Sequence, residues 1–291
     1  MSTVQSSQRE DIRGVAIMLY TELLKDESSE IDLVGPTLPA LKSLLEFPQQ
    51  DQALYTRLVH ALLSACLLHI DEMRGRQGLI SDKKVKNNML AAVLILTVVP
   101  NWVKIGRPVV EHCCFLITQR LLEDEEAIVL TAAHCSKTLI AASSLGSPIL
   151  IECTKRVLPG LIEFIAKMAP LVNDGNINEA CVAAIGEVWK AFSAFFSSIP
   201  DNQRTRALCI LLPTMSLLLS NQQPFVEAVR SQTATQLLSY ATSSPAAFKD
   251  AAAKLDQSIR DLLEQSIRRA IGSDATSTSA TAKPQISLRS F

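Results

Sequence analysis

The octapeptide LPALKSLL, residues 38–45, decides the fold class, because the chain repeats its pattern twice. The matching segments are LPGLIEFI at residues 158–165 and LPTMSLLL at residues 212–219, which share L-P-x-[LM]-x-x-[LF]-[LI]. A proline inside a helix removes one i→i−4 hydrogen bond and kinks the helix. We therefore expect kinked helices whose apolar residues after the proline face a stacked core.

The spacing of the three segments indicates a structural repeat. Their prolines, at positions 39, 159 and 213, are 120 and 54 residues apart. The first gap is about three HEAT periods, and the second is about one period with an insertion. The pattern also occurs by chance in leucine-rich chains, so a globular helical bundle stays open beside a repeat array.

Composition favours helices over strands. The chain has 291 residues, of which 48% are hydrophobic but only 5% aromatic, and it contains 10 glycines. Hairpins need glycine and strands favour aromatic residues, so a strand-rich fold is disfavoured. The formal net charge of −1 argues against binding nucleic acid through bulk electrostatics.

Cysteine usage and the apolar runs bear on the compartment. The seven cysteines are odd in number and mostly lie in apolar helical runs, which predicts buried free thiols in a reducing compartment. The first residues are polar, unlike a secretory signal. The longest uncharged apolar run, 89–99, is too short for a membrane span of roughly 20 residues. We expect a cytoplasmic protein, at most peripheral to a membrane.

Turn-forming and helix-breaking prolines, glycines and asparagines divide the chain into about a dozen predicted helices. Pro48, Gly146, Asn176 and Pro200 mark breaks between helical patterns, and the short connections make neighbouring helices antiparallel. The predicted fold is an all-α, HEAT- or armadillo-like α-solenoid over residues 1–271. Residues 272–291, rich in Ser, Thr and Ala, are predicted to be a disordered tail.

The first helix, expected over residues 9–25, carries a broad apolar face. Helical spacing gathers most of its large apolar side chains there, and such a face normally turns toward the core. Its members are Ile12, Val15, Ala16, Met18, Leu19, Leu23 and Leu24.

No catalytic, cofactor-binding or metal-binding residue is predicted. The His/Cys clusters are His112-Cys113-Cys114 and His134-Cys135. Adjacent residues on a helix diverge by about 100°, so they do not readily share an ion. CxxC, HExxH, GxSxG and the Gly-rich phosphate loops do not occur in the sequence. The chain is therefore expected not to be an enzyme.

Two features stand out as candidate partner contacts. Lys83, Lys84 and Lys86 form the densest basic region, which is either a solvated helix face or a contact for an acidic partner or lipid headgroup. Trp102 follows Pro100 in a predicted loop and is a candidate for a partly exposed anchor. Trp189, in EVWKAFSAFF, has helical spacing to several phenylalanines and is predicted to pack in the core.

Four ordered blocks resemble a known family. They are EIDLVGPTLPALKSLLE (30–46), RALCILLPTMSLLL (206–219), SSPAAFKDAAAKLDQSIRDLLEQSIR (243–268) and KPQISLRSF (283–291). In this order they resemble the C-terminal end of the HEAT repeat-containing protein 5 group. Those large HEAT-repeat proteins are accessory proteins of the clathrin adaptor that works between the trans-Golgi network and endosomes. Family members are many times longer, so the likeness concerns their final repeats.

The resemblance implies a scaffold without catalytic residues, whose partners are adaptor accessory proteins. It implies a role in vesicle traffic (endocytosis, retrograde transport and protein localisation) in the cytoplasm, with peripheral association at Golgi or endosomal membranes. In the terminal block, Ile286, Leu288 and Phe291 are candidates for a short docking motif. The alternative hypothesis is a compact helical bundle that binds a ligand or uses a buried thiol as a nucleophile.

Overall fold

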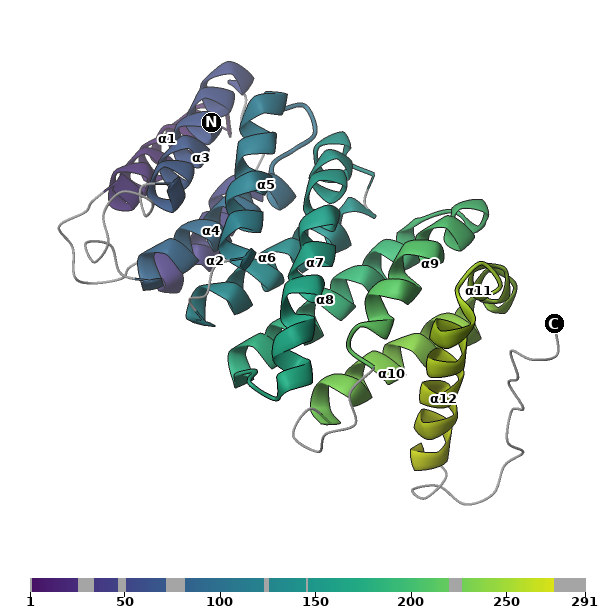
Figure 1. The fold of residues 1–291 in the computed structure, drawn as a ribbon. Helices are drawn as coiled ribbons and strands as arrows, with labels where there is room; N and C mark the ends of the chain where they lie inside the picture. Colours follow the sequence, from purple (N-terminus) through teal and green to yellow (C-terminus); the bar gives the residue numbers. More distant parts are fainter. Residues whose placement is uncertain are drawn as a thin grey trace. The chain divides into compact units, whose positions relative to one another are not determined.

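The computed structural model describes residues 2–25, 34–46, 51–71, 82–122, 126–144, 146–219 and 227–274 (Figure 1). Within these ranges every element of regular secondary structure is an α-helix. The helices form two compact units, residues 1–160 and 161–291, and the division falls inside helix α7 (Pro148–Asp174). Of the predicted tail (272–291), residues 272–274 belong to helix α12 (Gln257–Asp274), and the rest, with Ile286, Leu288 and Phe291, lies outside the described residues.

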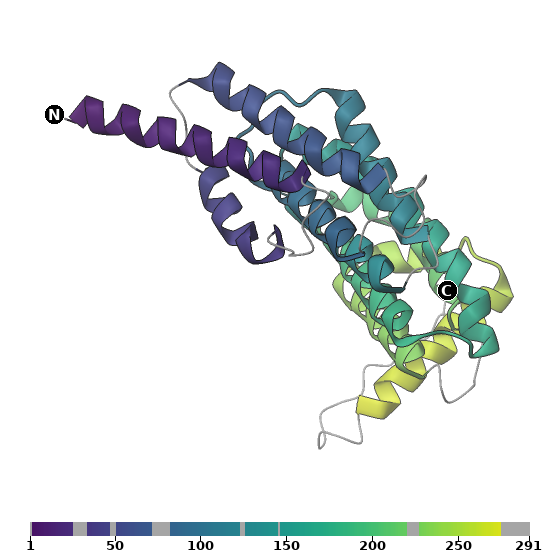
Figure 2. The ribbon, with the colours of Figure 1, turned by 90° about the vertical axis from the view of Figure 1, so that its left-hand side faces the viewer.

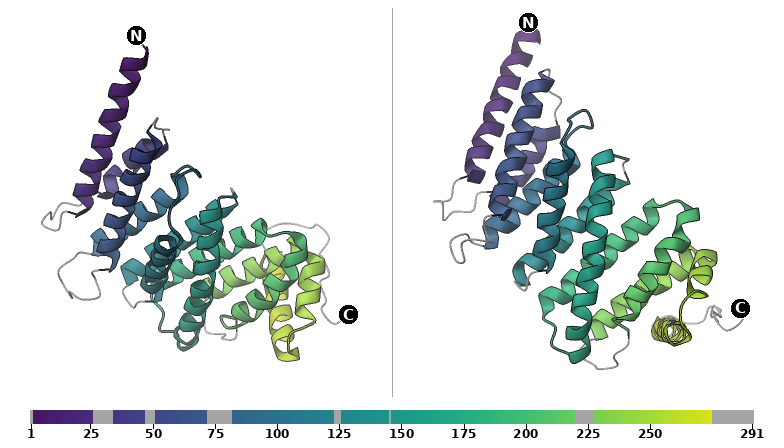
Figure 3. Two further views of the ribbon diagram at one scale, coloured as in Figure 1. Left: turned by 90° about the horizontal axis from the view of Figure 1, so that it is seen from above. Right: turned by 45° about the horizontal axis from the view of Figure 1, so that its top comes forward.

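The first unit is built from two layers of helices. In one layer α1 contacts α3 and α3 contacts α5, and in the other α2 contacts α4 and α4 contacts α6 (Figures 1 and 3). Sequential helices α1 and α2, α3 and α4, and α5 and α6 also pack together, so each pair is a helical hairpin. Figure 2 shows α1 alongside α3. Besides the start of α7, the helices are α1 (Ser2–Lys25), α2 (Val34–Glu46), α3 (Gln52–Asp71), α4 (Asp82–Val98), α5 (Arg107–Leu122) and α6 (Glu126–Ser143).

The second unit follows the same scheme. Helix α10 packs on α8 and α12, while α9 packs on α11. After the end of α7, its helices are α8 (Glu179–Ser198), α9 (Asp201–Ser216), α10 (Glu227–Ser243), α11 (Pro245–Ala252) and α12 (Gln257–Asp274). Stacked layers of helices in each unit confirm the predicted all-α fold for the described residues.

The turn between α7 and α8 shows why the sequence breaks where it does. Gly175 has a φ of 71°, which a residue without a Cβ adopts without strain. The amide of Asn176 donates to the carbonyl of Leu171 at 2.9 Å, and that of Gly175 donates to Val172 at 3.2 Å. This pair of bonds is a Schellman motif, which closes α7. The Asn178 side chain then accepts from the amide of Cys181 at 2.7 Å and caps α8.

The core of the second unit contains the predicted aromatic cluster. Trp189 and Phe192 are buried, and their ring centroids are 5.6 Å apart. The indole Nε1–H of Trp189 donates to Oγ1 of Thr233, on α10, at 3.1 Å. The prediction that Trp189 packs in the core is confirmed, and its polar edge is satisfied as a buried indole requires.

The expectation for the first helix was wrong in one respect. Helix α1 turns Ile17, Tyr20, Thr21 and Leu24 into the core. Part of the broad apolar face instead lies at the surface, and between 54% and 67% of each of these residues is exposed: Ile12, Val15, Met18 and Leu19. The helix carries apolar side chains on two faces, and periodicity alone did not show which face would pack.

The second LPxL segment contributes a close helix approach. A Cβ placed on Gly160 of α7 would lie 2.1 Å from Cγ2 of Thr118 on α5, and 3.2 Å from its Cβ. Only glycine therefore fits at this point of contact. The prolines of the three segments, Pro39, Pro159 and Pro213, all lie within helices.

Candidate interaction surfaces

An apolar groove of about 340 Å³ opens between α2, α4 and α6 of the first unit. Three helices of one layer supply its walls, so its lining comes from segments that are far apart in the sequence. Its apolar lining consists of Leu38, Pro39, Leu90, Val93, Leu94 and Cys135. We call this feature the α2–α4–α6 groove.

Four polar residues also line the groove. They are Lys42, Thr97, His134 and Thr138. The Thr97 hydroxyl donates to the carbonyl of Val93 at 2.9 Å, and that of Thr138 donates to the carbonyl of His134 at 2.9 Å, so both satisfy their own helices. Lys137 Nζ lies 3.2 Å from Nδ1 of His134.

The predicted lysines lie on α4 beside this groove. Lys83 is exposed, whereas Lys84 and Lys86 are half-buried. Positions 83, 86, 90, 94 and 97 follow helical spacing and share one face of α4, so Lys83 and Lys86 continue the stripe of groove-lining Leu90 and Leu94. Lys86 precedes Leu90 by about 6 Å along the axis. The sequence pattern indicated the lysines but not the groove. The one sequence feature that belongs to the groove is Leu38-Pro39 of the first LPxL segment.

Trp102 does not join the lysines. It lies in the connection after the C-terminal end of α4, whereas Lys83, Lys84 and Lys86 lie in the first turns of that helix. The Trp102 ring is half-buried and packs at 5.4 Å, centroid to centroid, on the ring of Tyr55. Tyr55 is fully buried and donates through its hydroxyl to the carbonyl of Leu45, near the end of α2, at 2.7 Å. Burial raises the pKa of Tyr55 to about 12, so it stays a donor.

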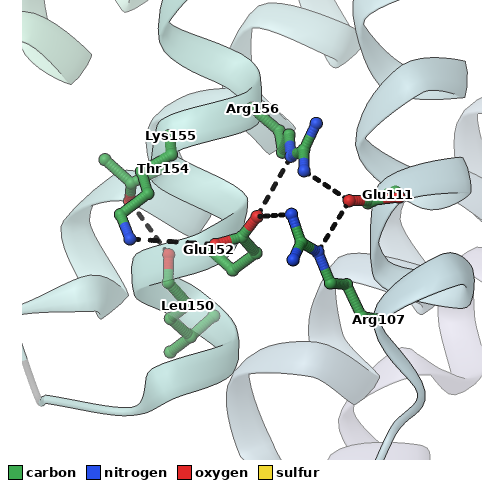
Figure 4. Close-up of polar contacts among 7 residues, drawn as sticks. All are labelled: Arg107, Glu111, Leu150, Glu152, Thr154, Lys155 and Arg156. Carbon is green, nitrogen blue, oxygen red and sulfur yellow. Dashed lines mark hydrogen bonds and ion pairs between the residues drawn. The ribbon is translucent and has the colours of Figure 1, made fainter.

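A ring of alternating charges joins α5 to α7 in the first unit (Figure 4). Arg107 Nε lies 2.9 Å from Oε1 of Glu111, and its Nη2 lies 3.7 Å from Oε1 of Glu152. Arg156 pairs with Glu111 through Nη2, and its Nε lies 3.1 Å from Oε1 of Glu152. The hydrogen bond from Arg156 and the neighbouring cations hold the pKa of Glu152 below its usual value. Each arginine in the ring pairs with both glutamates, so the ring links α5 to α7.

The thiols are placed for packing. Six cysteines are buried, Cys209 is half-buried, and all seven are free, which confirms the prediction of buried free thiols. Burial raises the pKa of Cys135 to about 12 and also raises that of Cys66. The pKa of Cys153 is raised by a hydrogen bond with Cys114 and by burial. A thiolate nucleophile needs a depressed pKa, and these surroundings act in the opposite direction.

Neither a metal cluster nor a shared His/Cys site occurs in the part of the chain that the structure describes. His112 is exposed, with Nε2 3.7 Å from Oδ2 of Asp71, while Cys113 and Cys114 are buried. The divergence expected of adjacent helical residues is therefore observed. Among the described residues, α8 is long and apolar enough to cross a membrane by length and composition; the buried core helix of a water-soluble protein meets the same criterion.

The stacked helical hairpins define the class of protein as an all-α helical-repeat protein of the solenoid type. The family described as LAA1-like, C-terminal TPR repeats matches residues 106–280, more than half of the chain. The chain belongs to this family. No curated protein and no solved structure matches it.

The family match confirms the helical-repeat class. TPR repeats are helix pairs of about 34 residues, whereas HEAT and armadillo repeats are about 40–47 residues long. The match supports a HEAT- or TPR-like repeat family, which agrees with the resemblance at that level. TPR-like repeats generally mediate contacts between proteins, and their families are typically scaffolds rather than enzymes.

Proposed function

We propose that this protein is a non-catalytic interaction scaffold in clathrin-adaptor-linked vesicle trafficking between the Golgi and endosomes. The observation that carries the proposal is the family match over residues 106–280. In this role the chain contributes to endocytosis, retrograde transport and protein localisation. Its partners are adaptor accessory subunits, and it works in the cytoplasm, peripherally associated with Golgi or endosomal membranes.

The placement of the resembling blocks supports this proposal. Block 30–46 covers α2, block 206–219 covers most of α9, and block 243–268 runs through α11 into α12. The second and third blocks lie inside the matched residues 106–280. The likeness thus extends over helices in both units rather than over one leucine-rich segment.

The alternative of a thiol-dependent enzyme has little support from the site chemistry. The pKa values of Cys66, Cys113 and Cys135 are raised by burial, and Cys135 is the one thiol among the described residues that line the α2–α4–α6 groove. A groove with a mostly apolar lining and a few donors suits recognition. A scaffold is therefore the function that the described residues favour.

The test is capture from cytosol with the whole 291-residue chain as bait, followed by immunoblotting for subunits of the Golgi–endosome clathrin adaptor. We expect enrichment over a bait of equal size that lacks helical repeats. A tagged chain should also colocalise with the adaptor on perinuclear and endosomal membranes. Absence of both enrichment and colocalisation would contradict the proposal. Deleting residues 283–291 asks whether the terminal block takes part: unchanged capture and unchanged thermal stability would exclude a role for it.

A further inference from the structure

The charged residues in and around the α2–α4–α6 groove indicate what kind of partner it binds. Of the described residues that line it, none carries a carboxylate, and its polar residues include Lys42 and His134. Lys42 is more than half exposed at its side chain, where Glu46 lies 3.6 Å from its Nζ. The groove therefore combines an apolar floor with the ammonium group of Lys42 at its edge.

The three helices that form the groove carry more lysines than acidic residues. Described lysines on α2, α4 and α6 are Lys42, Lys83, Lys84, Lys86 and Lys137. The acidic residues on the same helices stand at helix ends: Glu46 ends α2, while Asp82 and Glu126 begin α4 and α6. Positive charge thus borders the apolar stripe of α4 on its approach to the groove.

The groove walls fit a helix better than an extended peptide. An extended segment needs partners for its own backbone amides and carbonyls. Helical walls have few such partners to give, since their backbone groups bond within each helix, and the Thr97 and Thr138 hydroxyl protons are also used internally. A bound helix satisfies its own backbone and needs only apolar contacts and surface charge pairs.

We infer that the α2–α4–α6 groove binds an amphipathic helix of a partner protein, whose apolar stripe fills the groove and whose flanking carboxylates face Lys42, Lys83 and Lys86. This names the surface and partner chemistry for the proposed function, on which it rests. The chain's own terminal segment fits poorly, because residues 275–291 contain Lys283 and Arg289 but no acidic residue. A flat lipid surface also fits poorly, because headgroups reach the lysines but not an apolar floor between three helices.

The test uses a fluorescent helical peptide of about 18 residues, or five turns. It carries leucines at i, i+3, i+4 and i+7 spacing, flanked by glutamates, and a matched peptide has lysines in place of the glutamates. Fluorescence anisotropy with the full chain should show the acidic peptide binding at least about tenfold more tightly. Equal binding of the two peptides, or binding of neither, would overturn the inference.

Paired variants locate the binding. Lys42→Glu and Lys86→Glu together should weaken binding of the acidic peptide roughly five- to tenfold, since each reversal replaces an attraction to the glutamates of the peptide with a repulsion. Leu94→Ser should weaken it at least about tenfold by removing apolar contact. Lys254→Glu and Leu217→Ser are the matched controls, because both residues are exposed in the second unit. Lys42 is exposed on α2, so its variant keeps the test valid even where Leu94→Ser perturbs folding.

Two further arms separate the possible explanations. Sedimentation with phosphatidylserine vesicles tests the lipid reading; vesicle binding that depends on Lys42, together with no peptide binding, would overturn the inference. Adaptor capture is measured in parallel. Peptide binding without adaptor capture contradicts the proposed function and leaves the groove inference standing, whereas capture without peptide binding contradicts the groove inference alone.

Discussion

Nη2 of Arg120, on α5, donates to the carbonyl oxygen of Ile70 at 2.5 Å, and Ile70 lies in the last turn of α3. The last carbonyls of a helix have no partner within it, and a cation there also interacts favourably with the helix dipole. Arg120 is only 4% exposed, so its charge is held inside the unit by this bond and its other contacts. The bond ties two helices of one layer together.

Arg120→Ala should therefore lower the stability of the first unit. Removing the guanidinium leaves the Ile70 carbonyl without this buried donor and leaves a cavity, which costs about 2–4 kcal/mol. The measurement is the urea midpoint followed by circular dichroism. Arg57→Ala is the control: Arg57 is exposed on α3, so its replacement should change stability by less than about 0.5 kcal/mol. Equal midpoints for the two variants would show that the bond to Ile70 contributes nothing.

Gly160→Ala should destabilise the protein despite improving helix propensity. The new Cβ would meet Thr118 at 2.1 Å, and overpacking of this kind costs about 1–3 kcal/mol. The gain from replacing a helical glycine is at most about 1 kcal/mol. Thermal unfolding measures the net loss.

Gly14→Ala provides the matched comparison in the same unit. The nearest atom to its added Cβ is Cδ1 of Leu58 at 3.8 Å, an ordinary contact. Helix propensity then decides the sign of the effect, and the Gly14→Ala variant should be more stable by up to about 1 kcal/mol. The two glycine variants are thus expected to shift the melting temperature in opposite directions; a shift in the same direction would show that the helices move apart at Gly160 at little cost.

Leucines on the two faces of α1 should respond differently to one substitution. Leu24 is fully buried, so Leu24→Ala should cost about 2–5 kcal/mol. Leu19 is 66% exposed, so Leu19→Ala should stay within about 0.5 kcal/mol. Urea unfolding of both variants checks the comparison. A large loss for Leu19→Ala would mean that another surface covers this face in solution.

The sequence allowed the helices to be predicted more fully than their contacts. Local chemistry placed the ends: Gly175 and Asn178 set a break that depends only on neighbouring residues. Packing depends on residues far along the chain. The pattern of α1 contains two apolar faces, so it could not tell that Leu19 is exposed, and Gly160 signals nothing until Thr118 lies beside it. The groove was missed for the same reason, because α2, α4 and α6 form it together.

Alkylation should find slow thiols in the native protein. Burial raises the pKa of Cys135 to about 12 and raises that of Cys66, so little thiolate forms at neutral pH. Cys209 is half-buried and should react first with iodoacetamide, as mass spectrometry of modified peptides would show. All seven should react rapidly in urea. A single thiol that reacts fast in the native state would instead favour the thiol-dependent enzyme.

The ring of Arg107, Glu111, Glu152 and Arg156 should make the folding stability of the protein depend on pH in the acidic range. The folded-state pKa of Glu152 is lowered, chiefly by the hydrogen bond from Arg156. The unfolded chain therefore binds a proton at this position at a higher pH than the folded chain does. Stability from this carboxylate is present above the unfolded-state pKa and is lost as the pH falls through the lower, folded-state pKa.

In Glu152→Gln this part of the pH dependence should disappear, and the loss of stability on acidification should be shallower. Melting temperatures from neutral pH to below the usual glutamate range measure it, with Glu163→Gln, at an exposed position on α7, as the control. Parallel curves for the wild type and Glu152→Gln would show that Arg107 and Arg156 do not stabilise the ionised carboxylate in solution.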